Sequence, residues 1–266
     1  MSGRANIRKI QNKYQNNEKI VVLTAYDAHM AALCESLPID ILLVGDSLGM
    51  TVLGYDNTIP VTMDHMVHHC QAVTRGNKST FIIGDLPYLS CEISPELAIQ
   101  NGGRLMQEGG VSAVKVEGGQ HVAPTIQAMV RAGVPVVGHI GLMPQRVATE
   151  GGYRIHGKTP EEREALIADA KAVAAAGACA IVLEGIPSDI SKAITEVIDI
   201  PTIGIGAGPY CSGQVQVYHD LLGLFERFVP KHTRQYAQLN AIIKNALSAY
   251  AKDVQNGTFP SDNESF

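Results

Sequence analysis

The sequence has few aromatic residues and no tryptophan. Phenylalanine and tyrosine make up 5% of its 266 residues, whereas 45% of all residues are hydrophobic and 18% are charged. The apolar content therefore comes mainly from Val, Ile, Leu and Ala, which suit parallel strands buried beneath helices. A hydrophobic fraction of this size can form a large core, which excludes a globally disordered chain.

Basic residues and long hydrophobic runs are also scarce. Lys and Arg number 21 against 26 Asp and Glu, which gives a formal net charge of −5. Nucleic-acid binding depends on clustered Lys and Arg that neutralise phosphates, and because no basic cluster stands out we expect no nucleic-acid partner. The apolar run that ends at Val44 is far shorter than the ~20 residues of a membrane span, so we expect no membrane partner.

Cysteine is sparse, and its spacing shows no pairing. The chain has five cysteines, an odd number, and none of them forms a CxxC pair. This pattern argues against a disulfide framework and against a cysteine metal site. The first nineteen residues are polar and lack the apolar stretch of a secretory signal. Both observations favour a cytoplasmic protein with reduced thiols.

The sequence contains a regular alternation of short β-rich runs and longer helical patterns. The predicted strands are 20–24, 39–44, 80–84, 113–116, 135–138, 179–183, 201–205 and 215–218, the last having the weakest pattern. The predicted helices are 27–36, 62–74, 95–109, 122–132, 159–176, one from 188 onward and 235–254. About eight β/α units predict one (β/α)8 TIM barrel domain over 1–266, with a polar N-terminal segment and a C-terminal helix plus tail. A doubly wound open sheet is the alternative.

Acidic residues follow four of the predicted strands. Asp46, Asp85, Glu117 and Glu184 each end an apolar run. Because the C-terminal ends of barrel strands converge on one mouth, we expect these residues to meet there. Carboxylate oxygens without nearby cysteine suit a hard cation such as Mg²⁺, which can stabilise an enolate. The sequence therefore predicts a metal-dependent enzyme.

Three further features of these strand ends suggest roles. Lys115 alternates with valines and should point into the barrel, where it either binds a substrate carboxylate or forms a salt bridge with Glu117. His139 either hydrogen-bonds a substrate oxygen or is a satisfied core histidine. Glu184 directly follows Ala-Ile-Val-Leu, an apolar setting that favours a general base.

Two other patterns are less specific. His65, His68 and His69 have metal-like spacing, but no glutamate or third ligand completes a zinc signature, so we expect a partly exposed helix face. The glycines of Gly204-Ile-Gly-Ala-Gly208 could approach an anion, as in a phosphate-binding isomerase barrel, or could simply form a turn.

Short motifs along nearly the whole chain carry a family resemblance. They are Thr24-Ala-Tyr-Asp27, Val44-Gly-Asp-Ser-Leu-Gly-Met-Thr51, Pro60-Val-Thr62, Gly84-Asp-Leu-Pro87, Val114-Lys-Val-Glu-Gly-Gly119, Gly138-His-Ile-Gly-Leu142, Gly151-Gly-Tyr153, Leu183-Glu184, Ile203-Gly-Ile-Gly-Ala-Gly208 and His219-Asp220. In order and spacing these segments resemble the ketopantoate hydroxymethyltransferase family. The stretch 221–236 fits that family only loosely.

The resemblance implies a (β/α)8 enzyme of pantothenate biosynthesis. Members transfer a hydroxymethyl group from 5,10-methylenetetrahydrofolate to the 2-oxoacid 3-methyl-2-oxobutanoate, giving 2-dehydropantoate. By position, Asp46 and Asp85 are the implied Mg²⁺ ligands, with Glu117 close to the metal shell. The implied ketoacid-binding set is Asp46, Ser47, Asp85 and Lys115, and the implied proton acceptor is Glu184. The family also implies a homo-oligomer, usually a decamer.

Two rival functions share parts of this pattern. A Mg²⁺-dependent 2-oxoacid lyase or aldolase of the isocitrate lyase type would share the barrel and the metal carboxylates. Such enzymes characteristically use a reactive cysteine in a KKCGH-like loop, a segment that this sequence lacks. A non-catalytic binding protein on the same barrel predicts loss of the acidic set, yet all four acids are present.

Overall fold

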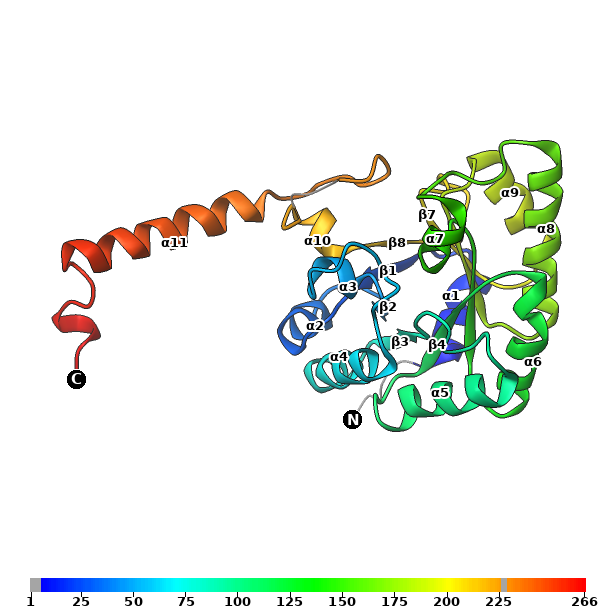
Figure 1. The fold of residues 1–266 in the computed structure, drawn as a ribbon, viewed down its shortest axis with the longest axis horizontal. Helices are drawn as coiled ribbons and strands as arrows, with labels where there is room; N and C mark the ends of the chain where they lie inside the picture. The colour runs from blue at the N-terminus through cyan, green and yellow to red at the C-terminus, as the bar shows by residue number, and fades with distance from the viewer. Residues whose placement is uncertain (1–5, 226–228) are drawn as a thin grey trace. The chain divides into compact units, whose positions relative to one another are not determined.

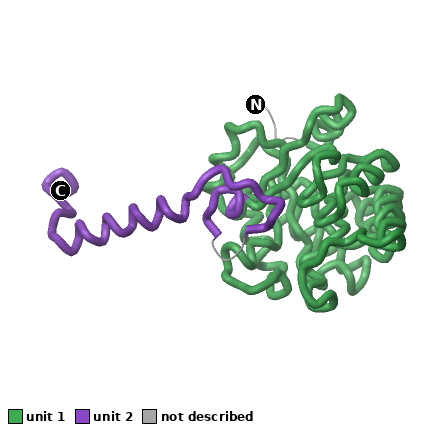
Figure 2. The backbone as a smooth tube through the Cα atoms, turned by 90° about the horizontal axis from the view of Figure 1, so that it is seen from above, with its two compact units in different colours: residues 1–217 green, residues 218–266 purple. Residues whose placement is uncertain are grey.

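The computed structural model describes residues 6–225 and 229–266. Residues 1–5, at the start of the polar N-terminal segment, and 226–228, within the stretch that fits the family loosely, lie outside the described residues. The chain divides into two compact units, residues 1–217 and 218–266, coloured separately in Figure 2. The first unit holds the barrel, and the second holds the C-terminal helices and tail.

The order of helices and strands is shown in Figure 1. The strands are β1 (Ile20–Thr24), β2 (Ile41–Val44), β3 (Phe81–Asp85), β4 (Ala113–Glu117), β5 (Val136–Gly141), β6 (Ala180–Glu184), β7 (Thr202–Ile205) and β8 (Gly213–Gln216). The α-helices are α1 (Ile7–Gln15), α2 (Ala28–Glu35), α3 (Leu48–Thr51), α4 (Met63–Gly76), α5 (Pro95–Gln107), α6 (Ala123–Arg131), α7 (Val147–Glu150), α8 (Pro160–Ala175), α9 (Ser188–Val197), α10 (Tyr218–Leu221) and α11 (Leu239–Asn256). Short 3₁₀ turns are η1 (Gln120–Val122), η2 (Pro144–Arg146) and η3 (Asp262–Glu264).

The eight strands form a closed parallel barrel. Each strand pairs with the next in sequence order, and β8 pairs with β1 to close the ring. The TIM barrel prediction is confirmed, and the open-sheet alternative is wrong. The last strand begins two residues before the predicted one, because Gly213 pairs with both Ile20 and Ile203.

The ends of several helices follow from local side-chain chemistry. The predicted cap Thr62 accepts a hydrogen bond from the His65 amide at the start of α4. Ser94 caps α5 in the same way, with Pro95 at its first position. Such caps satisfy amides that the first helical turn leaves without partners. They explain why these two helix starts were predictable from the sequence.

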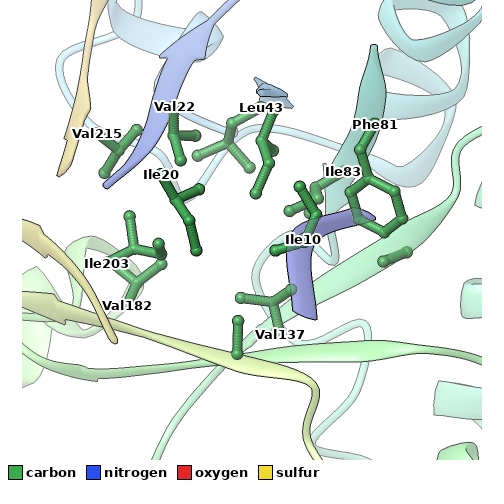
Figure 3. Close-up of a cluster of buried hydrophobic side chains, with 13 residues drawn as sticks. Ile10, Ile20, Val22, Leu43, Phe81, Ile83, Val137, Val182, Ile203 and Val215 are labelled. Carbon is green, nitrogen blue, oxygen red and sulfur yellow. The ribbon is translucent and has the colours of Figure 1, made fainter. Parts of the chain in front are cut away.

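Inward-facing strand residues fill the N-terminal end of the barrel. Figure 3 shows Ile20, Val22 and Phe81 among the side chains that meet there. Successive strand residues point to opposite faces, so alternate positions form this core. Ile10, from α1, belongs to the same cluster and is 1% exposed. The first helix therefore contributes to the N-terminal end of the barrel core.

Helix α1 was not predicted, because its composition is strongly polar. Ile7 and Tyr14 flank Ile10 at helical spacing and pack partly buried against the core. A partly buried ion pair joins the helix to the residue before β2, with Lys13 Nζ 2.6 Å from Asp40 Oδ2. The same carboxylate oxygen accepts the Val21 amide at 2.9 Å. Three apolar side chains and one ion pair thus hold the segment in place.

The barrel departs from regular alternation between its last two strands. Residues 206–212, all described, form a loop between β7 and β8 instead of a helix. In the second unit, α11 begins at Leu239, four residues after the predicted start. Among the described residues, none of the helices combines the length and apolar character that a bilayer crossing requires.

Candidate active site

Seven residues selected from the sequence line one cavity at the C-terminal mouth of the barrel. The cavity offers about 100 Å³ to water-sized molecules. Its lining includes Asp46, Ser47, Asp85, Lys115, Glu117, His139 and Glu184. The strands position them as expected, since each follows or occupies the C-terminal half of its strand. Residues up to 138 positions apart in the sequence are thereby brought to one place.

The strand register fixes which of these side chains are neighbours. Asp85 on β3 pairs with Lys115 on β4, and Glu117 pairs with His139 on β5. Lys115 and Glu117 are two residues apart on one strand, so both point inward. Each of these four residues is at most 5% exposed. Their charges therefore interact in a poorly solvated interior.

Lys115 lies between carboxylates of two strands. Its Nζ is 3.3 Å from Asp85 Oδ2 and 3.7 Å from Glu117 Oε1. Burial alone would lower the pKa of Lys115, but the surrounding carboxylates, Asp85 first, outweigh it and raise the pKa. The lysine is therefore a buried cation. The ion pair with Glu117, one of the two interpretations of Lys115, is present, and the closer contact with Asp85 was not foreseen.

Asp46 and Asp85 are two buried acids that contact each other through the Asp46 backbone. The Asp46 amide donates to Asp85 Oδ2 at 3.0 Å. Burial, followed by the charges of Asp85 and Glu117, raises the pKa of Asp46 well above its ordinary value. Burial also raises the pKa of Asp85, although Lys115 opposes it. Both carboxylates would be stabilised as anions by additional positive charge in the cavity.

These two carboxylates fit a divalent cation. Asp85 Oδ1 is buried without a hydrogen-bond partner, although buried oxygens are normally paired. In the described parts of the chain, no group of three or more His, Cys, Asp or Glu side chains is arranged as a complete metal site. Mg²⁺ usually takes only one or two protein carboxylates and completes its shell with water and substrate oxygens. Asp46 and Asp85 match that donor set.

His139 connects Glu117 with Glu184. Its Nδ1 lies 3.4 Å from Glu117 Oε1, and its Nε2 lies 3.2 Å from Glu184 Oε2. Burial and nearby Lys115 lower the pKa of His139, but the two glutamates outweigh them and raise it to about 9. Burial likewise acts to raise the pKa of Glu117, yet Lys115 and His139 bring it below its ordinary value. Lys115 Nζ also lies 3.2 Å from His139 Nδ1, so the imidazole contacts a cation as well as two glutamates.

Glu184 is the most accessible acid of the site, with 20% of its side chain exposed. Its backbone is fixed by β5, because the Leu142 amide donates to the Glu184 carbonyl at 2.8 Å. Gly141, the residue before Leu142, has φ +98°. A side chain at position 141 would collide with the Glu184 carbonyl oxygen. The close approach of the two strands requires glycine. Glu184 is thus rigid at its backbone and open to solvent at its carboxylate.

The structure adds uncharged residues that the sequence did not single out. Tyr26 Oη lies 2.7 Å from Ser47 Oγ, and burial raises the pKa of Tyr26 to about 12, so it remains a neutral phenol. Gln145, in the turn after β5, contacts Asp46 and Glu117. Tyr26 follows the apolar strand β1 by two residues, as Asp46 follows β2, but neither Tyr26 nor Gln145 carries a charge. The signal that revealed the acids, a charge at the end of an apolar run, could therefore not reveal them.

The two less specific sequence patterns have structural explanations. His68 is exposed and His65 and His69 are half-buried on α4, as expected, and His65 completes the helix cap with Thr62. In the glycine loop, Gly208 has φ +78°, and a side chain there would collide with Ser188 of α9. Close packing and a turn account for this glycine.

A closed parallel barrel with buried charged residues at its C-terminal mouth has the architecture of the α/β-barrel enzymes. The model of one family, described as ketopantoate hydroxymethyltransferase, matches residues 4–262. A 3-methyl-2-oxobutanoate hydroxymethyltransferase of Chloroflexus aurantiacus is 54% identical over 262 residues, covering 98% of this chain and 92% of that protein. One from Heliobacterium modesticaldum is 48% identical, covering 100% and 96%. The chain belongs to the ketopantoate hydroxymethyltransferase family.

Solved structures of more distant proteins share the fold. A 2,3-dimethylmalate lyase, described as a member of the PEP mutase/isocitrate lyase superfamily, superposes with a TM-score of 0.62 at 17% identity, covering 98% of this chain and 91% of that one. A phosphonopyruvate hydrolase crystallised with oxalate and Mg²⁺ gives 0.64 at 13% identity, covering 97% and 92%. At these identities the likeness establishes the barrel fold alone.

Proposed function

We propose that this protein transfers a hydroxymethyl group from 5,10-methylenetetrahydrofolate to 3-methyl-2-oxobutanoate, giving 2-dehydropantoate through a Mg²⁺-stabilised enolate. Family membership supports the transfer. The observation that carries the chemistry is the convergence of Asp46, Asp85, Lys115 and Glu184 on one cavity. It provides cation ligands, a fixed positive charge and a partly exposed base within a single small space.

In the proposed site, the ketoacid binds through its polar end. Asp46 and Asp85 would hold Mg²⁺, with Glu117 supporting them. When bound, the ion polarises the ketone and favours loss of the neighbouring proton. Lys115 would attract the substrate carboxylate, with Ser47 and His139 as hydrogen-bonding neighbours. The reacting C3 carbon would then face Glu184 at the more open side of the cavity.

Glu184 would act as the general base. Its carboxylate takes the C3 proton, and the electron pair of the broken C–H bond forms the enolate. The nucleophilic C3 then bonds to the one-carbon unit as that carbon's bond to one folate nitrogen breaks. Water next replaces the second folate nitrogen on the same carbon, and its oxygen becomes the product hydroxyl. The two nitrogens released as tetrahydrofolate take up the proton removed by Glu184 and one proton from water. His139 Nε2 lies 3.2 Å from Glu184 Oε2, close enough that a small adjustment on substrate binding would let it orient the carboxylate.

The first half of this reaction can be tested without folate. Purified protein with Mg²⁺ in D₂O should exchange the C3 proton of 3-methyl-2-oxobutanoate, which proton NMR detects. Glu184→Gln should reduce exchange about 10²–10⁴-fold, the usual contribution of a general base, with ketoacid binding largely retained. Removing the metal with EDTA should stop exchange, and adding Mg²⁺ should restore it.

A matched control separates chemistry from general damage. Glu196→Gln makes the same change on α9, where the side chain is 64% exposed, and should leave exchange unchanged. Absence of exchange in the wild-type protein at saturating Mg²⁺ would refute the enolate mechanism. Adding methylenetetrahydrofolate and measuring ketopantoate then tests the one-carbon donor.

The wider setting of the protein is part of the proposal. We place it in the cytoplasm, a location supported by five free cysteines, four of them buried. Thiols persist in that reducing compartment. We also propose a homo-oligomer, a decamer by family resemblance, with the ketoacid and folate as its small-molecule partners.

A further inference from the structure

Gln145 occupies an anchored turn beside the proposed catalytic base. The turn follows β5, whose last residue, Gly141, packs against the Glu184 backbone. The Leu142 amide bonds the Glu184 carbonyl, and the Arg146 amide closes the turn on the Met143 carbonyl at 2.9 Å. Gln145 itself is 4% exposed. Its position is therefore set by the backbone on both sides.

The side chain of Gln145 reaches the ends of two other strands. Its Nε2 donates to Asp46 Oδ2 at 2.8 Å and to the Leu86 carbonyl at 3.0 Å. Its backbone amide donates to Glu117 Oε2 at 3.2 Å. A primary amide has two hydrogens, and both are used. One residue therefore fixes an oxygen of each of two carboxylates of the site.

These bonds leave specific oxygens available. Asp46 Oδ2 is held by Gln145, while Asp85 Oδ2 is held by the Asp46 amide and faces Lys115. Asp85 Oδ1 is buried without a partner and is therefore the oxygen most clearly available to a cation. Gln145 Oε1 is also buried without a partner. Nε2 already donates to both acceptors, so rotating the amide group by 180° would place Oε1 against two oxygens that cannot donate a hydrogen bond.

We propose that Gln145 is a positioning residue that sets the affinity of the site for a divalent cation. It orients Asp46 through its side-chain amide and Glu117 through its backbone N–H. This inference rests on the proposed function, because it requires a cation at Asp46 and Asp85. Residues that orient metal ligands typically change metal affinity or activity by about 10–100-fold when replaced.

The test measures binding of Mn²⁺, a paramagnetic probe, to the full chain by electron paramagnetic resonance of the free ion. Gln145→Met keeps the length of the side chain and the backbone bond to Glu117 but removes the amide. We expect the Kd for Mn²⁺ to rise about 10–100-fold. In the exchange assay, the Mg²⁺ concentration for half-maximal rate should rise similarly, with kcat recovering at saturating Mg²⁺. A merely structural defect would lower kcat at every concentration.

The same substitution elsewhere provides the control. Gln120→Met alters an exposed glutamine that bonds Asp169 outside the cavity, and should leave the Kd unchanged. If Gln145→Met fails to fold, as thermal unfolding would reveal, Gln145→Asn serves instead, since its amide is one methylene too short to reach Asp46.

The outcomes distinguish this inference from the proposed function. If wild-type protein does not bind Mn²⁺, the proposed cation site is wrong and this inference falls with it. If wild-type protein binds Mn²⁺ and both Gln145 variants bind it equally well, Gln145 has no positioning role, and the proposed function is untouched.

Discussion

At the scale of single residues, the positive charge of Lys115 favours the ionised forms of two neighbouring acids, Asp85 and Glu117. It lies within 4 Å of Asp85 and Glu117 and is 5% exposed. Taking such charges out of water is costly, and the lysine offsets that cost for both acids. The same charge that would attract a substrate carboxylate therefore also stabilises the buried carboxylates of Asp85 and Glu117.

Replacing Lys115 should destabilise the fold as well as weaken ketoacid binding. Lys115→Met removes the cation that lies next to buried Asp85 and Glu117, and breaking a buried ion pair typically costs about 3–5 kcal/mol. Urea unfolding would measure this loss. Adding Asp85→Asn to Lys115→Met should recover part of it, because one uncompensated charge is then removed.

The control for this prediction is Lys192→Met. Lys192 is 55% exposed and 3.9 Å from Glu196, and substitutions at exposed pairs usually change stability by less than about 1 kcal/mol. Equal unfolding free energies for both lysine variants would show that Lys115 does not carry the balance of charge inside the barrel.

At the scale of elements, helix α1 stabilises the barrel through very few side chains. Ile10 is almost fully buried among strand residues, and Lys13 pairs with buried Asp40. Ile10→Ala should lower the free energy of unfolding by about 2–5 kcal/mol, the cost of truncating a core isoleucine. Chemical denaturation measures the change.

An exposed isoleucine gives the comparison for Ile10. Ile93, in the loop before α5, is 67% exposed, so Ile93→Ala should alter stability by no more than about 0.5 kcal/mol. A loss at Ile10 as small as that at Ile93 would contradict the burial of α1 against the core.

How far the sequence predicted these elements depends on the signal each one carries. Helices α4 and α5 begin at Thr62 and Ser94, whose capping chemistry is local. The acids of the site were found because charges that end apolar runs are conspicuous. Helix α1 escaped notice because its single fully buried residue, Ile10, depends on tertiary packing. Gln145 escaped because its role depends on a loop path that brings it to Asp46, 99 positions away.

At the scale of the whole molecule, α11 carries an apolar stripe suited to self-association. Ile243, Leu247, Tyr250 and Val254 are spaced by three or four residues, so they share one helix face, and each is at least 44% exposed. We expect light scattering to give a mass several times the 28.4 kDa of one chain.

A charge within this stripe should weaken self-association. Leu247→Glu is expected to shift the mass toward that of a single chain, because a carboxylate in an apolar interface must be desolvated. Ser248→Glu introduces the same charge away from the stripe and should leave the mass unchanged. If both variants keep the wild-type mass, the stripe is not an interface.

The placement of α1 also bears on the order in which substrates would bind and products would leave. Its side chains Ile7 and Ile10 line an apolar pocket at the N-terminal end of the barrel. The charged cavity lies at the opposite end, where 20% of the Glu184 side chain is exposed. Under the proposed function, both substrates and both products would enter and leave at this C-terminal end of the barrel. If Lys115 and the aspartates hold the ketoacid at the bottom of the cavity and the folate binds above it, the ketoacid would enter first and its product would leave after tetrahydrofolate. Under the proposed function we therefore expect initial-rate kinetics to show ordered binding, with the ketoacid first.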